Sequence, residues 1–183
     1  MNYKNIYKLV LILLLALAGI KNGMSQYSEY EIKAAYIFNF AKFLDWPSSD
    51  LNADTIVLAI YNNDPFGIVL EKTMVGRKAN GKVWKIIRTK NKMDLENCHI
   101  AFFSDIEKYE LIKILDKLDK KPVLTIGDEI IDFCESGGNI NFTSQFSENQ
   151  FEINNDAAKS QKIVISPKLL LLAKIVSNNE DEF

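Results

Sequence analysis

The chain has 183 residues, of which 48% are apolar and 25% are charged, with 22 Lys and Arg against 24 Asp and Glu. This length and composition predict one ordinary globular domain and leave no room for two large ones. Without the three lysines of residues 1–25, 19 basic residues stand against 24 acidic ones. A moderately acidic domain without a basic run is not expected to bind a nucleic acid backbone, so we exclude that class of function.

The first 25 residues have the layout of a secretory signal peptide. Two lysines precede an apolar run at residues 9–20, and small residues lie three and one positions before a cut ahead of Gln26. The run would span about 18 Å as a helix, which is short of the ~30 Å hydrocarbon core of a bilayer. We predict cleavage, export to the periplasm and no stable membrane insertion. The alternative is an uncleaved single anchor.

The only two cysteines are Cys98 and Cys134, and export would place them where disulfides persist. A bridge would close a loop of about 37 residues and add about 4 kcal/mol of stability. Both cysteines also lie beside apolar segments, so two separate buried thiols are the alternative. In either case we expect a structural role for them, because neither has a cluster of basic neighbours in sequence that would lower its pKa.

A long amphipathic helix is predicted over residues 29–46, where Pro47 would stop it. Its apolar arc covers roughly 200°, about twice what a surface helix needs, and Phe38 lies on the polar side as well. One core does not use that much apolar surface, so the helix is expected to face two neighbours. The predicted partner or dimer surface consists of Tyr36, Phe38, Phe40, Phe43 and Trp46.

Between residues 55 and 153, apolar strands alternate with helical segments. Strands are predicted at 55–61, 82–88, 98–104, 123–126, 139–143 and 150–153, and helices at 64–73, 106–118 and, more briefly, from 127 to 137. Continuous apolar strands separated by helices predict an α/β fold. We expect a mainly parallel sheet of about five to six strands, with helices on both faces and a late β-hairpin.

The C-terminal part ends in another apolar segment. Ser166 and Pro167 predict the start of a helix over residues 168–176, in which only two lysines are charged. A helix that is apolar all round is expected to be buried in the core or in an interface. Residues 178–183 form an acidic tail that we expect to be disordered. The predicted domain is therefore 26–177, without an internal boundary.

No catalytic, metal-binding or cofactor-binding arrangement is predicted. The single histidine, His99, follows Cys98 directly, and neighbours on a strand point to opposite faces. Phosphate-loop, dinucleotide-binding and nucleophile-elbow motifs are absent from the sequence. Asp64 and Asp128 stand where helix N-caps are expected. The sequence thus predicts a protein that is not an enzyme.

Seven short segments, taken together and in order, resemble one known family. They are residues 32–43 with Trp46 and Pro47, 64–67, 98–104, 122–128, 137–142, 151–154 and 165–170. Over residues 30–176 the chain resembles the YfiR-like family of periplasmic regulatory proteins. The resemblance implies an exported, non-enzymatic α/β domain, often dimeric, whose best-known relatives hold a membrane diguanylate cyclase inactive.

Two functions follow as hypotheses. The first is a periplasmic regulatory protein, expected to be a homodimer, that restrains or tunes an inner-membrane signalling partner such as a diguanylate cyclase or a sensor kinase. The second is a periplasmic sensor module that binds a small molecule at the carboxyl ends of the parallel strands, near residues 61–63 and Gly127. An enzyme ranks third.

Overall fold

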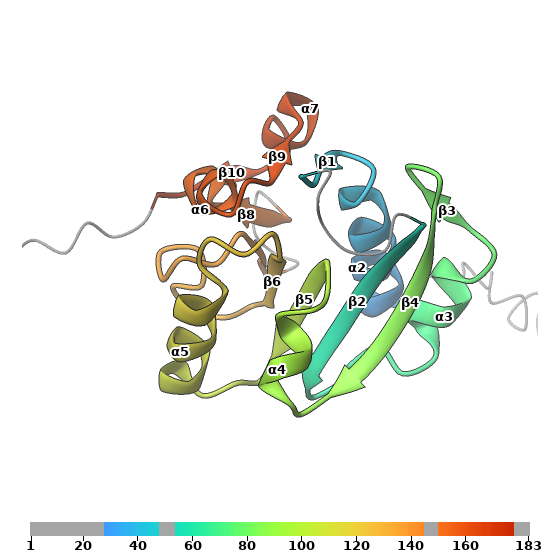
Figure 1. Cartoon of the computed structure of the whole chain (residues 1–183), viewed down its shortest axis with the longest axis horizontal. Coiled ribbons are helices and arrows are strands. Elements are labelled where there is room, and N and C mark those ends of the chain that lie inside the picture. The colour runs from blue at the N-terminus through green and yellow to red at the C-terminus, as the bar shows by residue number, and fades with distance from the viewer. Residues whose placement is uncertain (1–27, 48–53, 145–149, 178–183) are drawn as a thin grey trace, which may run out of the picture.

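The structure is a computed structural model that describes residues 28–47, 54–144 and 150–177 (Figure 1). The expected signal peptide, its cut ahead of Gln26 and the acidic tail lie outside these residues. Within them, an eight-stranded sheet has the order β10-β8-β7-β6-β5-β2-β4-β3, with helices packed on both faces. The predicted α/β class is confirmed. The strand count exceeds the prediction because two-residue strands, which carry little sequence signal, lie at both edges.

The middle of the sheet is parallel. Its strands are β4 (Lys82–Thr89), β2 (Thr55–Asn62), β5 (Ile100–Ser104), β6 (Leu124–Asp128) and β7 (Ile140–Phe142). Each pairs in parallel with its neighbours in that order, so the first strand of the five along the chain lies between the second and the third. This is the order of a doubly wound sheet, whose topological switch point lies between β2 and β5.

Shorter strands extend the sheet at both edges. At one edge β3 (Lys78–Ala79) runs antiparallel to β4. At the other, β8 (Phe151–Ile153) runs antiparallel to β7, which confirms the predicted late hairpin. The outermost strand, β10 (Lys174–Ile175), runs parallel to β8.

Two hydrophobic clusters fill the space between the sheet and its helices. The helices are α2 (Glu29–Phe40), α3 (Val69–Met74), α4 (Lys92–Leu95), α5 (Lys108–Leu118), α6 (Asn155–Ser160) and α7 (Pro167–Leu170). Leu58 and Ile60 belong to the cluster under α2 and α3, whereas Ala59 and Tyr61 belong to the one under α4 and α5. Alternate residues of β2 therefore face opposite layers, as the period of two along a strand requires.

The first helix is shorter than predicted. It begins with a capping box between Ser28 and Glu31 and ends at Phe40, six residues before the predicted end. The chain then turns into β1 (Leu44–Asp45), which pairs antiparallel with β9 (Val164–Ile165). The backbone N–H of Ser166 donates to Phe43 O at 2.9 Å. Pairing with a distant segment, rather than Pro47, therefore ends the helical stretch.

The last helix differs from the prediction as well. Its start is confirmed, because the Ser166 side chain accepts from Lys168 N and Pro167 occupies the first turn. It ends at Leu170 after four residues, however, and the chain continues into β10. The short segment predicted as a helix after Gly127 forms turns instead.

The predicted surface on α2 is largely internal. Phe38 and Phe40 are only 2% and 1% exposed. The guanidinium carbon of Arg77 lies 3.9 Å from the centre of the Phe38 ring, and Trp84 packs 5.9 Å from it. A basic side chain thus covers an aromatic ring on the polar side of the helix, an arrangement that cation–π attraction favours. Phe38 and Phe40 consequently do not belong to a surface that a partner could contact.

Candidate functional site

The most exposed apolar segment of the described chain follows α7. Leu171 is 85% exposed, Leu172 63% and Ile175 53%. Val164 on the neighbouring β9 is 61% exposed, and β9, α7 and β10 lie at the same end of the molecule (Figure 1). We call these four residues the C-terminal apolar surface. The stretch that was expected to be buried in the core or in an interface is therefore not in the core, and it offers apolar side chains to solvent.

This surface adjoins an open edge of the sheet. The N–H of Val176 donates to Ile153 O at 2.9 Å, which fixes β8 on one side of β10. In this parallel register the peptide N–H and C=O of Ile175 point away from β8. No strand of the described residues pairs with β10 on that other side. Unpaired strand edges beside apolar side chains are suited to binding an extended segment of another chain.

The part of α2 that remains exposed lines one side of a hollow. Ile32 is 45% exposed, and with Ala35 and Tyr36 it lines a hollow of about 550 Å³ against Lys72 and Arg77. Tyr36 is partly buried because its ring packs 5.6 Å from Phe151. Of the five predicted surface residues, Phe43 is the most exposed, at 37%.

His99 has a structural environment. It is 1% exposed, and its Nδ1 accepts a hydrogen bond from Val57 N at 3.1 Å. The partly buried Trp46 packs edge-on against the imidazole at 5.9 Å. The fifth predicted surface residue, Trp46, is thereby held against the interior of the chain.

Both cysteines are buried free thiols, so the disulfide that the sequence left open is not formed. The Sγ of Cys98 donates to Leu95 O at 3.3 Å. Burial raises the pKa of Cys98 to about 12, and burial together with the negative charges of Glu152 and Glu135 raises the pKa of Cys134 to about 12. At neutral pH neither thiol supplies the thiolate that nucleophilic or redox chemistry requires.

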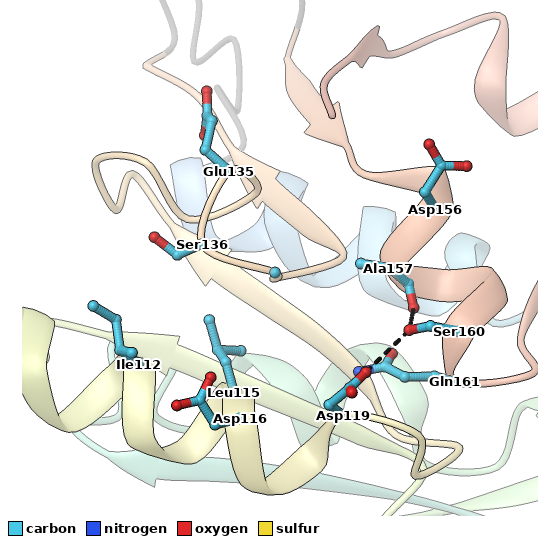
Figure 2. Close-up of a pocket in the computed structure, with 11 residues that line it drawn as sticks. Ile112, Leu115, Asp116, Asp119, Glu135, Ser136, Asp156, Ala157, Ser160 and Gln161 are labelled. Carbon is cyan, nitrogen blue, oxygen red and sulfur yellow. Dashed lines mark hydrogen bonds between the residues drawn. The ribbon is translucent and has the colours of Figure 1, made fainter. Parts of the chain in front are cut away.

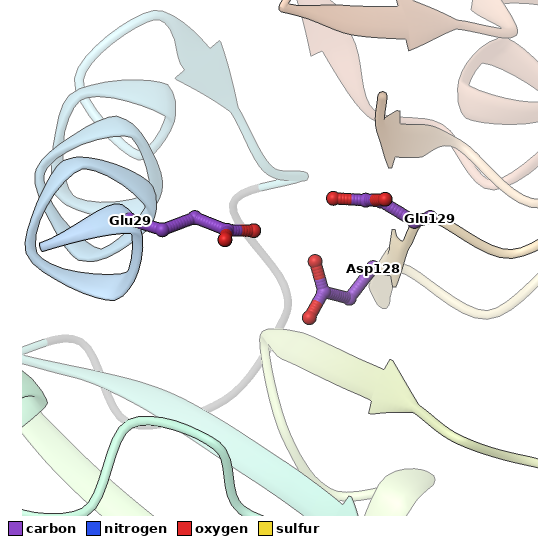
Figure 3. Close-up of side chains that lie close together, drawn as sticks. All are labelled: Glu29, Asp128 and Glu129. Carbon is purple, nitrogen blue, oxygen red and sulfur yellow. The ribbon is translucent and has the colours of Figure 1, made fainter. Parts of the chain in front are cut away.

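A group of carboxylates lies at the carboxyl end of β6. Glu29, Asp128 and Glu129 each offer an oxygen within 4.8 Å of the others (Figure 3). The ammonium of Lys33 contacts all three, at 2.5 Å from Asp128 and 3.3 Å from Glu129, with Glu29 also bonded. Asp128 therefore ends a strand and pairs with Lys33, and the prediction that it caps a helix is wrong.

The ion pairs of Lys33 with these carboxylates have a structural role. Burial alone would lower the pKa of the Lys33 ammonium, but its hydrogen bonds to Asp128 and Glu29 hold that pKa above the ordinary value. A positive charge thus already occupies the position that a metal ion would take, and the group joins α2 to the end of β6. Sequence reasoning missed Lys33, although its spacing from Tyr30, Ile37 and Phe40 places it on the buried stripe of the helix.

The carboxyl ends of the central strands carry strained backbone. Asn62, Asp105 and Glu129 lie at the ends of β2, β5 and β6, and all have positive φ, between 45° and 63°. A hollow of about 620 Å³ is lined there by residues 105, 106, 108 and 128–131. None of the residues near which a small-molecule site was predicted, 61–63 and Gly127, lines this hollow, which lies beside the ends of β5 and β6.

A larger pocket, of about 730 Å³, lies between α5, the turn before β7, and α6 (Figure 2). It is closer to the amino ends of the parallel strands, because α5 leads into β6 and the turn leads into β7. Its polar side chains are Asp116, Asp119, Glu135, Ser136, Asp156, Ser160 and Gln161. No sequence spacing connects Asp116 and Asp119 with Glu135 or Asp156.

Fold and surface together describe a doubly wound α/β domain with an apolar patch beside an open sheet edge. A family model described as YfiR/HmsC-like matches residues 30–174, so the chain belongs to that family. The family is known in general terms for periplasmic regulators of diguanylate cyclases and is not known as a family of enzymes. A search of curated proteins gives no match. Among the described helices, none has the length and apolar character needed to cross a membrane.

Proposed function

We propose that this chain is a periplasmic, non-enzymatic regulatory protein that binds an inner-membrane signalling partner, such as a diguanylate cyclase, and restrains or tunes it. Membership of the YfiR/HmsC-like family and the secretory layout of residues 1–25 support this proposal. The observation that carries it is the C-terminal apolar surface beside β10.

The apolar side chains of this surface contribute little to the stability of the chain while they face water. Burying one leucine fully is worth about 1.5–3 kcal/mol, so covering Leu171 and Leu172 by a partner supplies a large part of a specific binding energy. The outward peptide groups of Ile175 would add directional hydrogen bonds to the same contact. Exposed apolar side chains and an unpaired strand edge lie together on this surface. The surface is therefore suited to binding another protein.

The test compares two exposed apolar residues at different places. Leu171→Lys puts a charge on the C-terminal apolar surface, and Ile131→Lys does the same at a residue that is 82% exposed near the carboxyl ends of the strands. We expect the wild-type protein and Ile131→Lys to capture the same inner-membrane protein from a detergent extract. Leu171→Lys should capture at least about tenfold less, as the loss of one hot-spot residue predicts.

Two outcomes would contradict this proposal. If both variants capture the membrane protein equally well, the C-terminal apolar surface is not the contact with the partner. If deletion of the protein does not change the cellular level of cyclic di-GMP, the partner is not a diguanylate cyclase. A sensor kinase then remains as the proposed partner. Sedimentation of the wild type and Leu171→Lys tests the predicted homodimer separately, because a second copy could occupy the same edge.

The second candidate function is that of a small-molecule sensor. The pocket between α5 and α6 favours it, since its volume of about 730 Å³ lies within the range of ligand sites. The two functions are distinguished by whether the purified chain binds a small molecule in the absence of any membrane protein.

A further inference from the structure

Basic residues are concentrated at one edge of the sheet. Residues 72–93 contain eight of the 22 lysines and arginines of the chain and no aspartate or glutamate. This segment runs from α3 through β3 and β4 into α4. Arg88 pairs with Asp64 and Glu71, and Lys92 pairs with Glu110. Six others form no ion pair with a described acidic residue, so their positive charge is uncompensated: Lys72, Arg77, Lys78, Lys82, Lys85 and Lys90.

Part of this basic segment lies on a sheet face that the helices leave open. Side chains alternate along β4, so Val83, Lys85 and Ile87 point to the side of α4 and α5. Lys78 on β3 is the register partner of Val83 and lies on the same side. Val57, the partner of Lys85 on β2, is only 7% exposed, whereas Lys85 and Lys78 are exposed. Figure 1 shows no helix in front of β4, whereas α2 lies behind the sheet.

Apolar side chains are exposed beside these lysines. Val83 is 45% exposed, and Met93 on α4 is 66% exposed. The exposed Lys90 lies in the turn that joins β4 to α4. Within the described ranges, Asp54 and Asp94 lie beside this face but pair with none of its lysines, and Asp94 accepts from a threonine hydroxyl at 2.5 Å instead. We call the following residues the basic sheet face: Lys78, Val83, Lys85, Lys90 and Met93.

We propose that the basic sheet face binds the surface of an anionic phospholipid bilayer, with its ammonium groups on lipid phosphates and with Val83 and Met93 among the headgroups. Lysine stems lie along apolar surface while their charged ends reach outward, and the attraction of several lysines to an anionic bilayer adds up. No hydrogen bond among the described residues fixes the side chains of Lys78, Lys85 and Lys90. Such mobile charges suit a fluid array of phosphates better than the fixed carboxylates of a protein. The contact is peripheral and needs no helix across the membrane.

This inference goes beyond the proposed function, which concerns a membrane protein. The basic sheet face lies at the β3 edge of the sheet, and the C-terminal apolar surface lies at the β10 edge. One chain can therefore contact the bilayer and its signalling partner at the same time. The bilayer contact would concentrate the regulator at the membrane and restrict its orientation there.

Sedimentation with lipid vesicles tests the proposal. The chain is purified from Gln26 onward, so that the apolar run at residues 9–20 takes no part. At about 150 mM salt, where isolated contacts between exposed charges are largely screened, we expect binding to vesicles that contain phosphatidylglycerol and none to vesicles of phosphatidylcholine alone. The double variant Lys78→Glu with Lys85→Glu should bind about 30-fold more weakly, the factor that the loss of two lysines at an anionic surface predicts.

A matched control separates this face from the net charge of the chain. Lys113→Glu with Lys120→Glu changes the net charge equally, and both lysines are exposed, on α5 and directly after it. This double variant should bind the vesicles as the wild type does. Melting curves of both double variants establish that they are folded.

Several results would overturn the proposal: equal binding to both kinds of vesicle, an equal loss in the two double variants, or no binding at all. In the last case the lysines would serve only to keep the edge of β4 from pairing with other strands. Tighter binding of a soluble polyglutamate peptide than of the anionic vesicles would assign the face to an acidic protein instead. If vesicle binding fails while the capture of the membrane partner depends on Leu171, the bilayer inference is rejected and the regulatory function stands.

Discussion

The two apolar terminal segments of the domain have opposite environments. In α2, the stripe of Ala34, Ile37 and Phe40 is at most 1% exposed, because the helix lies across the sheet. After α7, Leu171 and Leu172 are mostly exposed, because a four-residue helix offers no long face to pack. Apolar composition alone therefore does not decide burial. The first segment stabilises the fold, and the second leaves apolar side chains in contact with water.

The largest change in stability is expected for a substitution in the buried stripe of α2. The Phe40 ring packs 5.0 Å from Phe151 and 5.8 Å from Phe142. Phe40→Ala would leave a cavity and lower the free energy of unfolding by about 3–5 kcal/mol. Phe43→Ala, three residues further on and 37% exposed, should cost much less. Urea denaturation of both variants measures the difference, and similar costs would mean that Phe40 is not a core residue.

A somewhat smaller loss is expected when the link between α2 and the sheet is broken. Lys33→Ala would leave the carboxylate of Asp128, whose side chain is 6% exposed, without its ammonium partner. Removing one partner of a buried ion pair costs about 3–5 kcal/mol. Because Glu29 and Glu129, which also pair with Lys33, are partly exposed, we expect a loss at the lower end of this range.

The double variant tests whether the loss comes from the unpaired charge. Lys33→Met with Asp128→Asn removes both charges and should recover part of the stability of Lys33→Ala in the same denaturation assay. A double variant less stable than Lys33→Ala by the full cost of a second lost interaction would show that the two residues act independently.

The sequence was sufficient for the parts of the fold that local patterns specify. The apolar runs of β2, β5 and β6 and the hairpin of β7 and β8 were predicted within a few residues, because burial on both faces gives a continuous apolar run. The ends of the two terminal helices were not. Leu44 pairs with Ile165, and Lys174 with Glu152, and such long-range pairing leaves no periodic signal.

The candidate sites were harder to predict than the fold. Phe38 looked exposed on a helical projection, which cannot show that Arg77 covers its ring. The pocket between α5 and α6 joins residues that are up to 49 positions apart, from Ile112 to Gln161, and no spacing rule connects them. Where a site depends on packing between elements, composition identifies its residue types but not their neighbours.

A substitution in the exposed segment after α7 should change the stability only slightly. Leu172→Lys replaces a side chain that is 63% exposed, so the free energy of unfolding should change by no more than about 0.5 kcal/mol. Urea denaturation checks this value, and capture of the membrane partner should fall in the same variant. A loss of more than about 2 kcal/mol would mean that the C-terminal apolar surface is part of the core.

The smallest effect is expected from reductant. Cys98 and Cys134 are both buried as free thiols, so no bond is present for a reductant to break. Melting curves with and without reductant should coincide, whereas a bridge worth about 4 kcal/mol would shift the midpoint by several degrees. Because burial raises the pKa of each thiol to about 12, alkylation of the folded chain at pH 8 should be slow. After unfolding in urea, both cysteines should react rapidly without prior reduction. A chain that gives no reactive thiols until reductant is added would instead show that the two cysteines pair in the purified protein.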